Sequence, residues 1–344
     1  MSVSVSSPMD SLGRAEEECA CLDTVAVVLA GGEGSRLRPL TDQQCKPALP
    51  FAGAARIVDF VIANLANSGI RRIIVLAQYK PDTLVEHLHR HWTPLFAATG
   101  RILRIVLPRS EAPADRFAGT ADAVAKAREH WSRLAPSWVA VFAADHIYRM
   151  DVAQMIHAHR RSGAGITVAA LPVPLAEARE LGVLRTEAGG RIIGFQEKPD
   201  RPVPMPRDPA LAYASMGNYV FDAQVLRNVL WRAEREGHVD FGRDVLPAAI
   251  HRERAFAYDF TTNRIPGVAN PAPYWRDVGT LASLELARAE IGSLDAPIRI
   301  EEPVWPLRPL APDARNLPPV RGRPGRNGSG RGIEAPVLAG QDDG

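Results

Sequence analysis

The sequence predicts an α/β protein with a Rossmann-like mixed, mainly parallel sheet that carries helices on both faces. The first observation is the apolar, β-branched run 25–30, which is typical of a buried parallel strand. The second is that strand-like and helix-like segments then alternate along the chain. The third is a later hairpin pattern around Ala188-Gly189-Gly190, which adds antiparallel strands to the sheet.

Apolar patterns assign the elements in chain order. Strands are predicted for 25–30, 72–77, 104–107, 139–143, 165–173, 184–185, 191–196, 214–221 and 256–259. Helices are predicted for 58–68, 81–92, 119–130, 152–161, 223–236 and 280–291, with a further one after Asp244. Thr120 is a plausible cap for its helix. His87, His89 and His91 are spread around the helix 81–92, so we interpret them as solvated rather than metal-binding.

Length and composition indicate a globular protein with one large domain or two. Of the 344 residues, 46% are hydrophobic, and the net charge of +2 gives no reason to expect nucleic acid or a membrane surface. Residues 1–23 have no signal-peptide pattern and predict a disordered arm. Residues 24–308 form the predicted folded domain, and the Pro/Gly/Arg-rich end predicts a disordered, low-complexity tail over 309–344. We expect a cytoplasmic protein whose three cysteines form no disulfide framework.

Lysine is rare in this chain. Of its 41 lysines and arginines, four are lysines: Lys46, Lys80, Lys126 and Lys198. Such a bias indicates a GC-rich genome in which arginine replaces lysine wherever either residue serves. An ammonium group is not equivalent to a planar guanidinium at a crowded phosphate.

The segment after the first strand predicts a phosphate-binding loop. Gly31, Gly32 and Gly34 let a ligand approach main-chain N–H groups, and two cations, Arg36 and Lys46, follow. The loop is not a Walker A motif, which needs Lys-Ser/Thr after its last glycine. It is not a dinucleotide fingerprint either, because Leu37 stands at the third glycine position, and this argues against an NAD-dependent dehydrogenase.

Gly-Gly-x-Gly-x-Arg-Leu with Lys-Pro resembles the signature of sugar-nucleotide pyrophosphorylases. Over about residues 24–308 the order of motifs is similar to the bacterial and plant glucose-1-phosphate adenylyltransferases. The motifs are Arg56-Ile57-Val58-Asp59-Phe60, Asn67-Ser68-Gly69-Ile70, Gly119-Thr120-Ala121-Asp122-Ala123-Val124, Asp145-His146-Ile147-Tyr148, Glu197-Lys198-Pro199, Ala214-Ser215-Met216-Gly217 and Tyr274-Trp275-Arg276-Asp277-Val278-Gly279-Thr280.

The resemblance implies a nucleotidyltransferase fold, small-molecule substrates and a reaction of a nucleoside triphosphate with a sugar 1-phosphate. The attacking phosphate oxygen is already an anion, so the site must supply positioning and electrostatics rather than a general base. The implied catalytic residues are Arg36, Lys46 and Asp145, and Mg²⁺ would be held by Asp145 and Asp277. The implied nucleotide-binding residues are Gly31, Gly32, Gly34, Gly119, Thr120 and Glu111. The implied sugar-phosphate residues are Gly182, Glu197, Lys198, Ser215 and Phe117.

Several positions depart from that family. We expect no C-terminal β-helix of the kind that this family carries, and we expect any homo-oligomer to form through the catalytic domain. Ala54 and Ala118 replace two effector-site cations, which argues against sugar-phosphate activation. Phe117 replaces a sugar-site tyrosine, and Glu111 replaces a glutamine. A carboxylate only accepts hydrogen bonds and so suits guanine better than adenine.

With these departures the chain resembles the specialised valienol-1-phosphate guanylyltransferases of aminocyclitol natural-product biosynthesis. That resemblance implies GTP and a glucose-like cyclitol phosphate as substrates. Two alternatives stay open. One is an unregulated glucose-1-phosphate adenylyltransferase that makes ADP-glucose. The other is a non-catalytic regulatory subunit, which would be expected to lose residues such as Arg36 or Lys46.

Overall fold

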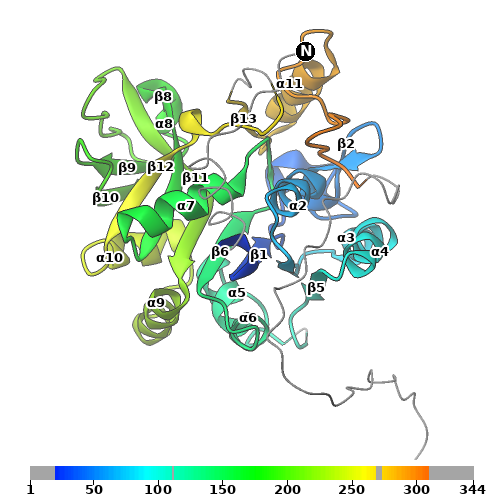
Figure 1. Ribbon diagram of the computed structural model, residues 1–344, viewed down its shortest axis with the longest axis horizontal. Coiled ribbons are helices and arrows are strands. Elements are labelled where there is room, and N and C mark those ends of the chain that lie inside the picture. The colour runs from blue at the N-terminus through cyan, green and yellow to red at the C-terminus, as the bar shows by residue number, and fades with distance from the viewer. Residues whose placement is uncertain (1–19, 111, 269–272, 310–344) are drawn as a thin grey trace, which may run out of the picture. The chain divides into compact units, whose positions relative to one another are not determined.

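A nine-stranded sheet runs through the computed structural model, which describes residues 20–110, 112–268 and 273–309 (Figure 1). One half of the sheet consists of four parallel strands in the order β6-β1-β4-β5, with β5 at the edge. These strands are β1 (Thr24–Leu29), β4 (Arg72–Leu76), β5 (Ile102–Val106) and β6 (Trp138–Ala143). The predicted fold class is therefore confirmed.

Antiparallel strands extend the sheet beyond β6. The long strand β11 (Leu211–Asp222) pairs with β6, with β8 (Ile166–Pro174) and with β9 (Gly182–Thr186). Strand β10 (Ile192–Glu197) closes the predicted hairpin with β9, and β12 (Ala255–Asp259) lies parallel to β8. The mixed sheet thus has a parallel half that carries the glycine loop and an antiparallel half beside it.

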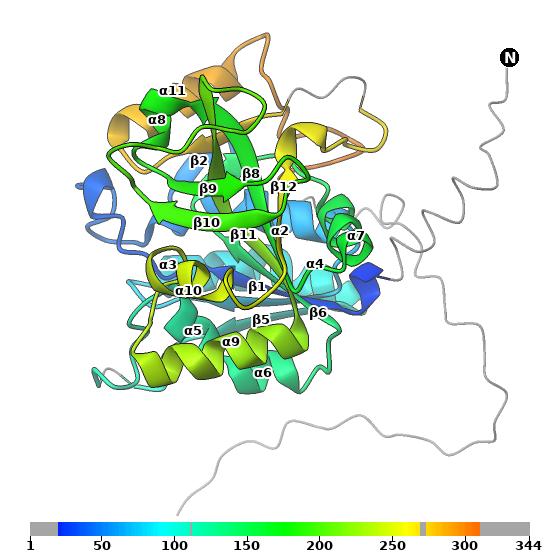
Figure 2. The same cartoon turned by 90° about the vertical axis from the view of Figure 1, so that its left-hand side faces the viewer.

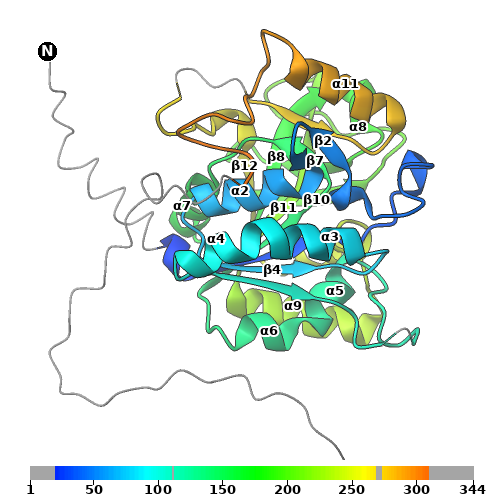
Figure 3. The same cartoon turned by 90° about the vertical axis from the view of Figure 1, so that its right-hand side faces the viewer.

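Helices cover both faces of the sheet (Figures 2 and 3). Along β1, Val25 and Val27 belong to one buried cluster and Ala26 and Val28 to the other, because successive side chains point to opposite faces. Because both faces of this strand are buried, its sequence does not alternate between polar and apolar residues. One face packs against α2 (Ile57–Asn67), α3 (Asp82–His87), α4 (Thr93–Ala98), α7 (Val152–Ser162) and α11 (Leu281–Gly292). The other packs against α5 (Thr120–Lys126), α6 (Arg128–Ser132), α9 (Ala223–Glu236) and α10 (Leu246–Ala249), while α8 (Leu175–Ala178) covers a small third cluster.

The region predicted as one helix over 81–92 differs from expectation. It consists of α3, a π-helical segment over Leu88–Trp92, and α4, so the helical region ends at Ala98. His87 is buried rather than solvated, and its Nε2 lies 2.6 Å from Asp59 Oδ1. Trp92 Nε1 donates to the same carboxylate oxygen at 2.7 Å. The buried Asp59 charge, at the first turn of α2, is the physical reason that His87 turns inward.

Two small sheets were not predicted. Strand β2 (Pro50–Ala52) pairs with β3 (Ala55–Arg56), and β7 (His146–Tyr148) pairs antiparallel with β13 (Trp275–Asp277). In the second pair, Asp277 lies opposite His146. Residues more than a hundred positions apart in the sequence are therefore brought together at the sheet edge.

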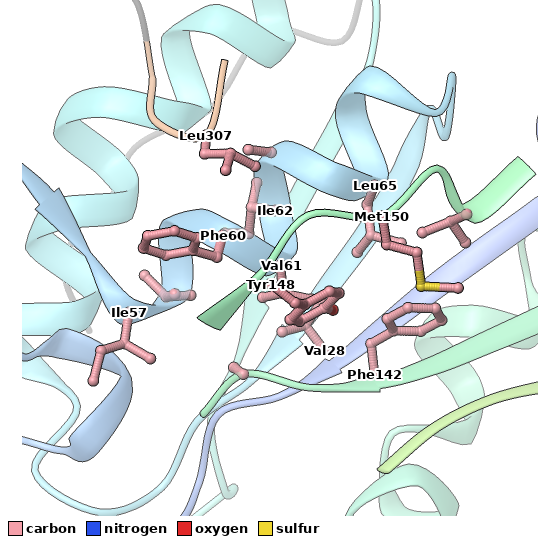
Figure 4. Close-up of a cluster of buried hydrophobic side chains, with 14 of the residues drawn as sticks. Val28, Ile57, Phe60, Val61, Ile62, Leu65, Phe142, Tyr148, Met150 and Leu307 are labelled. Carbon is pink, nitrogen blue, oxygen red and sulfur yellow. The ribbon is translucent and has the colours of Figure 1, made fainter. Parts of the chain in front are cut away.

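Both ends of the described chain pack into the core. Ala20 and Cys21 are 2% and 1% exposed, so residues 20–23, which the sequence assigns to the disordered arm, belong to the packed structure. The predicted boundary of the arm is wrong at these positions because Ala20 and Cys21 bury apolar surface in the core. Residues 1–19 and 310–344 lie outside the described residues. Figure 4 shows Leu307 in the same apolar cluster as Phe60, Ile62 and Phe142. Within the described ranges, no helix is both long and apolar enough to cross a membrane.

Candidate active site

The glycine loop leaves the carboxyl end of β1. Gly34 has a φ of +66°, and a Cβ at this position would lie 2.9 Å from Lys46 Cβ, so the turn requires glycine. The following 3₁₀ turn, Ser35–Leu37, buries Leu37 and leaves Arg36 exposed. The loop therefore places an arginine and several main-chain N–H groups at one edge of the sheet.

A pocket of about 450 Å³ lies at the carboxyl ends of β1, β4 and β6. This is the edge at which open α/β sheets bind their ligands. Nine residues singled out from the sequence line it: Gly31, Gly32, Gly34, Arg36, Lys46, Phe117, Gly119, Thr120 and Asp145. Sequence reasoning missed four further lining residues of interest, namely Gln78, Asp240, Gly279 and the apolar Leu76.

Lys46 connects the glycine loop to two carboxylates. Its Nζ lies 3.1 Å from Asp145 Oδ2 and 3.3 Å from Asp277 Oδ1, and the residue is 5% exposed. Burial would raise the pKa of the Asp145 carboxyl, but the neighbouring His146 and Lys46 side chains hold that pKa well below its usual range. The Asp145 carboxylate therefore stays ionised beside the buried Lys46 side chain. The prediction that Lys46 contacts phosphate remains a prediction.

The same carboxylates suit a divalent cation. One ligand atom each of Asp145, Asp277 and His146 lies within 4.8 Å of the others. Carboxylate oxygens are the ligands that Mg²⁺ prefers, and a nucleotide would add phosphate oxygens. His146 was not predicted as part of this group. Its Nδ1 is buried and lies 3.4 Å from Asp145 Oδ1, and its ring centroid lies 4.9 Å from that of Trp275.

Gly279 makes room for Arg36. A Cβ on Gly279 would lie 2.8 Å from Arg36 Nη2 and 3.2 Å from both carboxylate oxygens of Asp277. The arginine of the glycine loop therefore rests against the segment that carries Asp277. The Trp-Arg-Asp-Val-Gly-Thr motif contains this glycine, but its sequence does not indicate which side chain would need the space.

The start of α5 is closed by the chain itself. Val239 O accepts hydrogen bonds from the N–H groups of Ala121 (2.8 Å) and Asp122 (3.1 Å). A Cβ on Gly119 would lie 2.4 Å from the same oxygen, which explains the glycine without a ligand. Thr120 does not cap its helix as predicted. Its hydroxyl instead donates to Asp240 Oδ2 and accepts from the N–H of Phe241, both at 2.9 Å, because Asp240 offers a stronger, charged acceptor.

Phe117 lines the glycine-loop pocket rather than grouping with the other predicted sugar-phosphate residues. Gln78, two residues after β4, holds the backbone of Phe117 through two hydrogen bonds. The N–H of Phe117 donates to Gln78 Oε1 at 2.5 Å, and Gln78 Nε2 donates to Phe117 O at 3.2 Å. Glu111, the predicted base-reading residue, lies outside the described residues.

Four predicted sugar-phosphate residues lie on the antiparallel half of the sheet. Gly182 and Glu197 are opposite one another on β9 and β10, Lys198 follows directly, and Ser215 is on β11. The Glu197 carboxylate lies near Gly242, where a Cβ would be 2.9 Å from Oε2. Burial, with help from Asp240, raises the pKa of Glu197, although Lys198 acts in the opposite direction. None of the four lines the glycine-loop pocket as described.

Two carboxylates, a buried lysine and a glycine loop meet at this edge of the sheet. This combination is typical of enzymes that act on phosphorylated ligands and stabilise charge. The chain belongs to the nucleotidyl transferase family, whose sequence profile matches residues 25–293.

Three similar proteins are named as glucose-1-phosphate adenylyltransferases. The protein from Thermodesulfovibrio yellowstonii is 43% identical over 304 residues, which cover 86% of this chain and 72% of the relative. That from Thermus caldophilus is 44% identical over 295 residues, 83% of this chain and 71% of the relative. One from Vibrio vulnificus strain YJ016 is 39% identical over 318 residues, 92% of this chain and 77% of the relative. The predicted enzyme class, a sugar-1-phosphate nucleotidyltransferase, is confirmed.

Proposed function

We propose that this protein transfers the adenylyl group of ATP to glucose 1-phosphate, giving ADP-glucose and pyrophosphate. The observation that carries the proposal is the buried Lys46 between Asp145 and Asp277, directly beside the glycine loop. The names of the relatives support the choice of ATP and glucose 1-phosphate.

In this proposal the pocket binds the triphosphate. Main-chain N–H groups of Gly31, Gly32 and Gly34 face the phosphates, and Arg36 neutralises the leaving pyrophosphate. Gly119, Thr120 and Phe117 line the rest of the pocket toward the nucleoside. Mg²⁺, held by Asp145 and Asp277, would neutralise charge on the phosphates when bound.

The sugar phosphate would bind on the antiparallel half of the sheet. Lys198 offers an ammonium group for the phosphate, and Glu197 offers a carboxylate that accepts from a sugar hydroxyl. Gly182 and Ser215 complete this side. Asp240 lines the pocket and also lies close to Glu197 through Gly242, so it joins the two halves of the site. The chain's contribution is then to hold two anions close together and in line.

The guanylyl and cyclitol alternative has less support. It depends on Glu111, which lies outside the described residues, and on Phe117, which faces the glycine-loop pocket. The relatives carry adenylyl names. The regulatory-subunit alternative is disfavoured by the presence of Arg36, Lys46, Asp145 and Lys198. GTP and valienol 1-phosphate therefore enter the test as competing substrates.

The test is pyrophosphate release by the purified full chain with Mg²⁺. ATP and GTP are crossed with glucose 1-phosphate and valienol 1-phosphate, and Asp277→Asn serves as the inactive control. We expect the highest kcat/KM with ATP and glucose 1-phosphate. Faster turnover with GTP and the cyclitol phosphate would replace the proposal with the guanylyltransferase alternative. No turnover with any pair would favour the regulatory subunit.

A further inference from the structure

Two of the four lysines have no role in the site so far, namely Lys80 and Lys126. In a chain with 41 lysines and arginines, of which four are lysines, a lysine marks a position where arginine does not serve equally well. Lys46 is explained by its two carboxylates, and Lys198 by the proposed sugar phosphate. The Nζ atoms of Lys80 and Lys126 each donate to a main-chain carbonyl oxygen of a segment near the pocket. The sequence does not indicate these contacts.

Lys126 holds the segment that carries Phe117. From the last turn of α5, its Nζ donates to Arg116 O and pairs with Asp122 Oδ2 at 2.9 Å. The same carboxylate oxygen of Asp122 accepts from the N–H of Ala118 at 2.7 Å. One helical turn therefore holds the backbone on both sides of Phe117, while Gln78 holds Phe117 itself.

Lys80 holds the segment that follows the glycine loop through a similar contact to a main-chain carbonyl. Its Nζ donates to Asp42 O, and it lies 5.3 Å from the ring centroid of Tyr79. Lys80 has a φ of +37°, a left-handed conformation that a non-glycine residue rarely adopts, and it stands directly before Pro81. A strained conformation persists only where the surrounding contacts require it. Here the strained Lys80 connects the segment after β4, which contains Gln78, to the segment that follows the glycine loop.

We propose that Lys80 and Lys126 are positioning residues whose ammonium groups hold the two loops that border the pocket. Lys80 acts on the glycine loop through Asp42, and Lys126 acts on residues 116–118 through Arg116. Neither lysine lines the pocket. Both therefore set the affinity for the nucleoside triphosphate by fixing the backbone that contacts it. The identity of that ligand rests on the proposed function.

The experiment compares Lys80→Met and Lys126→Met with the wild-type full chain. Calorimetry measures ATP binding in Mg²⁺ buffer, and pyrophosphate release gives KM for each substrate and kcat. Loss of one hydrogen bond predicts that the Kd and KM for ATP rise about fivefold or more. The KM for glucose 1-phosphate and kcat should stay within about twofold of wild type.

Matched controls remove surface ion pairs that reach neither loop. Arg133→Met breaks the pair with Glu129 on α6, and Arg90→Met breaks the pair with Glu86 beside α3. Both controls should retain wild-type ATP affinity, because each pair is exposed and four residues apart on one helical segment. Their melting temperatures show what the loss of a surface cation alone does to stability.

Three results would overturn the assignment. One is a change in ATP affinity of less than about twofold in both lysine variants. The second is an equal change in every kinetic constant together with a drop in melting temperature that the controls do not show, which would indicate a folding role. The third is wild-type ATP affinity in Lys126→Arg, since the role is assigned to the ammonium group. A wild-type chain that binds no ATP would instead overturn the proposed function, so the two failures are distinguishable.

Discussion

Replacing Gly279 by alanine tests how the glycine loop and the acidic pair depend on each other. The added Cβ would lie 2.8 Å from Arg36 Nη2, which is closer than a methyl group and a nitrogen can approach. Gly279 does not have a positive φ, so alanine can adopt its backbone conformation without strain. Of the groups that the Cβ would meet, the arginine is the end of a long, exposed side chain and can move.

The structure therefore predicts a small effect on stability and a large effect on activity. Because Arg36 moves instead of the backbone, the free energy of unfolding should change by less than about 1 kcal/mol. If Arg36 contacts phosphate as proposed, its displaced guanidinium loses a charge-assisted contact worth about 1.5–3 kcal/mol. That loss corresponds to a decrease in kcat/KM of roughly 10- to 150-fold.

The assay is a double-mutant cycle on pyrophosphate release. Gly279→Ala, Arg36→Ala and the double variant are compared with Gly189→Ala, a control whose Cβ meets nothing within 4 Å. If Gly279 acts through Arg36, Gly279→Ala should lower kcat/KM only slightly in the Arg36→Ala background. An equal loss in both backgrounds would refute the reasoning, and so would a melting temperature that falls as much as the activity.

Three further predictions concern the core and the buried site. Lys46→Met leaves Asp145 and Asp277 without their shared cation, so kcat/KM should fall by about 100-fold or more while the fold is retained by circular dichroism. Asn64→Ala removes bonds to Tyr148 O, to the N–H of Met150 and to Trp305 Nε1, and should lower the free energy of unfolding by about 2–4 kcal/mol in urea titrations; a loss under 1 kcal/mol would contradict it. Burial raises the pKa of the Cys45 thiol to about 11, so at pH 8 roughly 100-fold less thiolate forms than in an ordinary cysteine. Peptide mapping after iodoacetamide should show slow labelling of Cys45 in the native protein and fast labelling in urea, and equal rates would show that the thiol is accessible.

The sequence by itself determined the class of the fold and the position of the phosphate loop. Buried parallel strands are apolar along their whole length, so β1, β4 and β6 are visible without any long-range information. A glycine turn with positive φ restricts the residue type locally, so Gly34 also marks itself. The charges at Arg36 and Lys46 follow within the same short segment.

Only the tertiary structure decided how the charged residues meet. Lys46 contacts Asp145 and Asp277, which lie 99 and 231 residues away in the sequence. The pairing of β7 with β13 brings these two carboxylates together, but both strands are too short to leave a periodic pattern in the sequence. His87 was interpreted as solvated because nothing on its own helix indicates the buried Asp59 that it contacts. Thr120 was interpreted as a cap because Asp240, its actual partner, is distant in the sequence. Local pattern determines which elements form, whereas desolvated charge is satisfied by whichever partner the fold brings within reach.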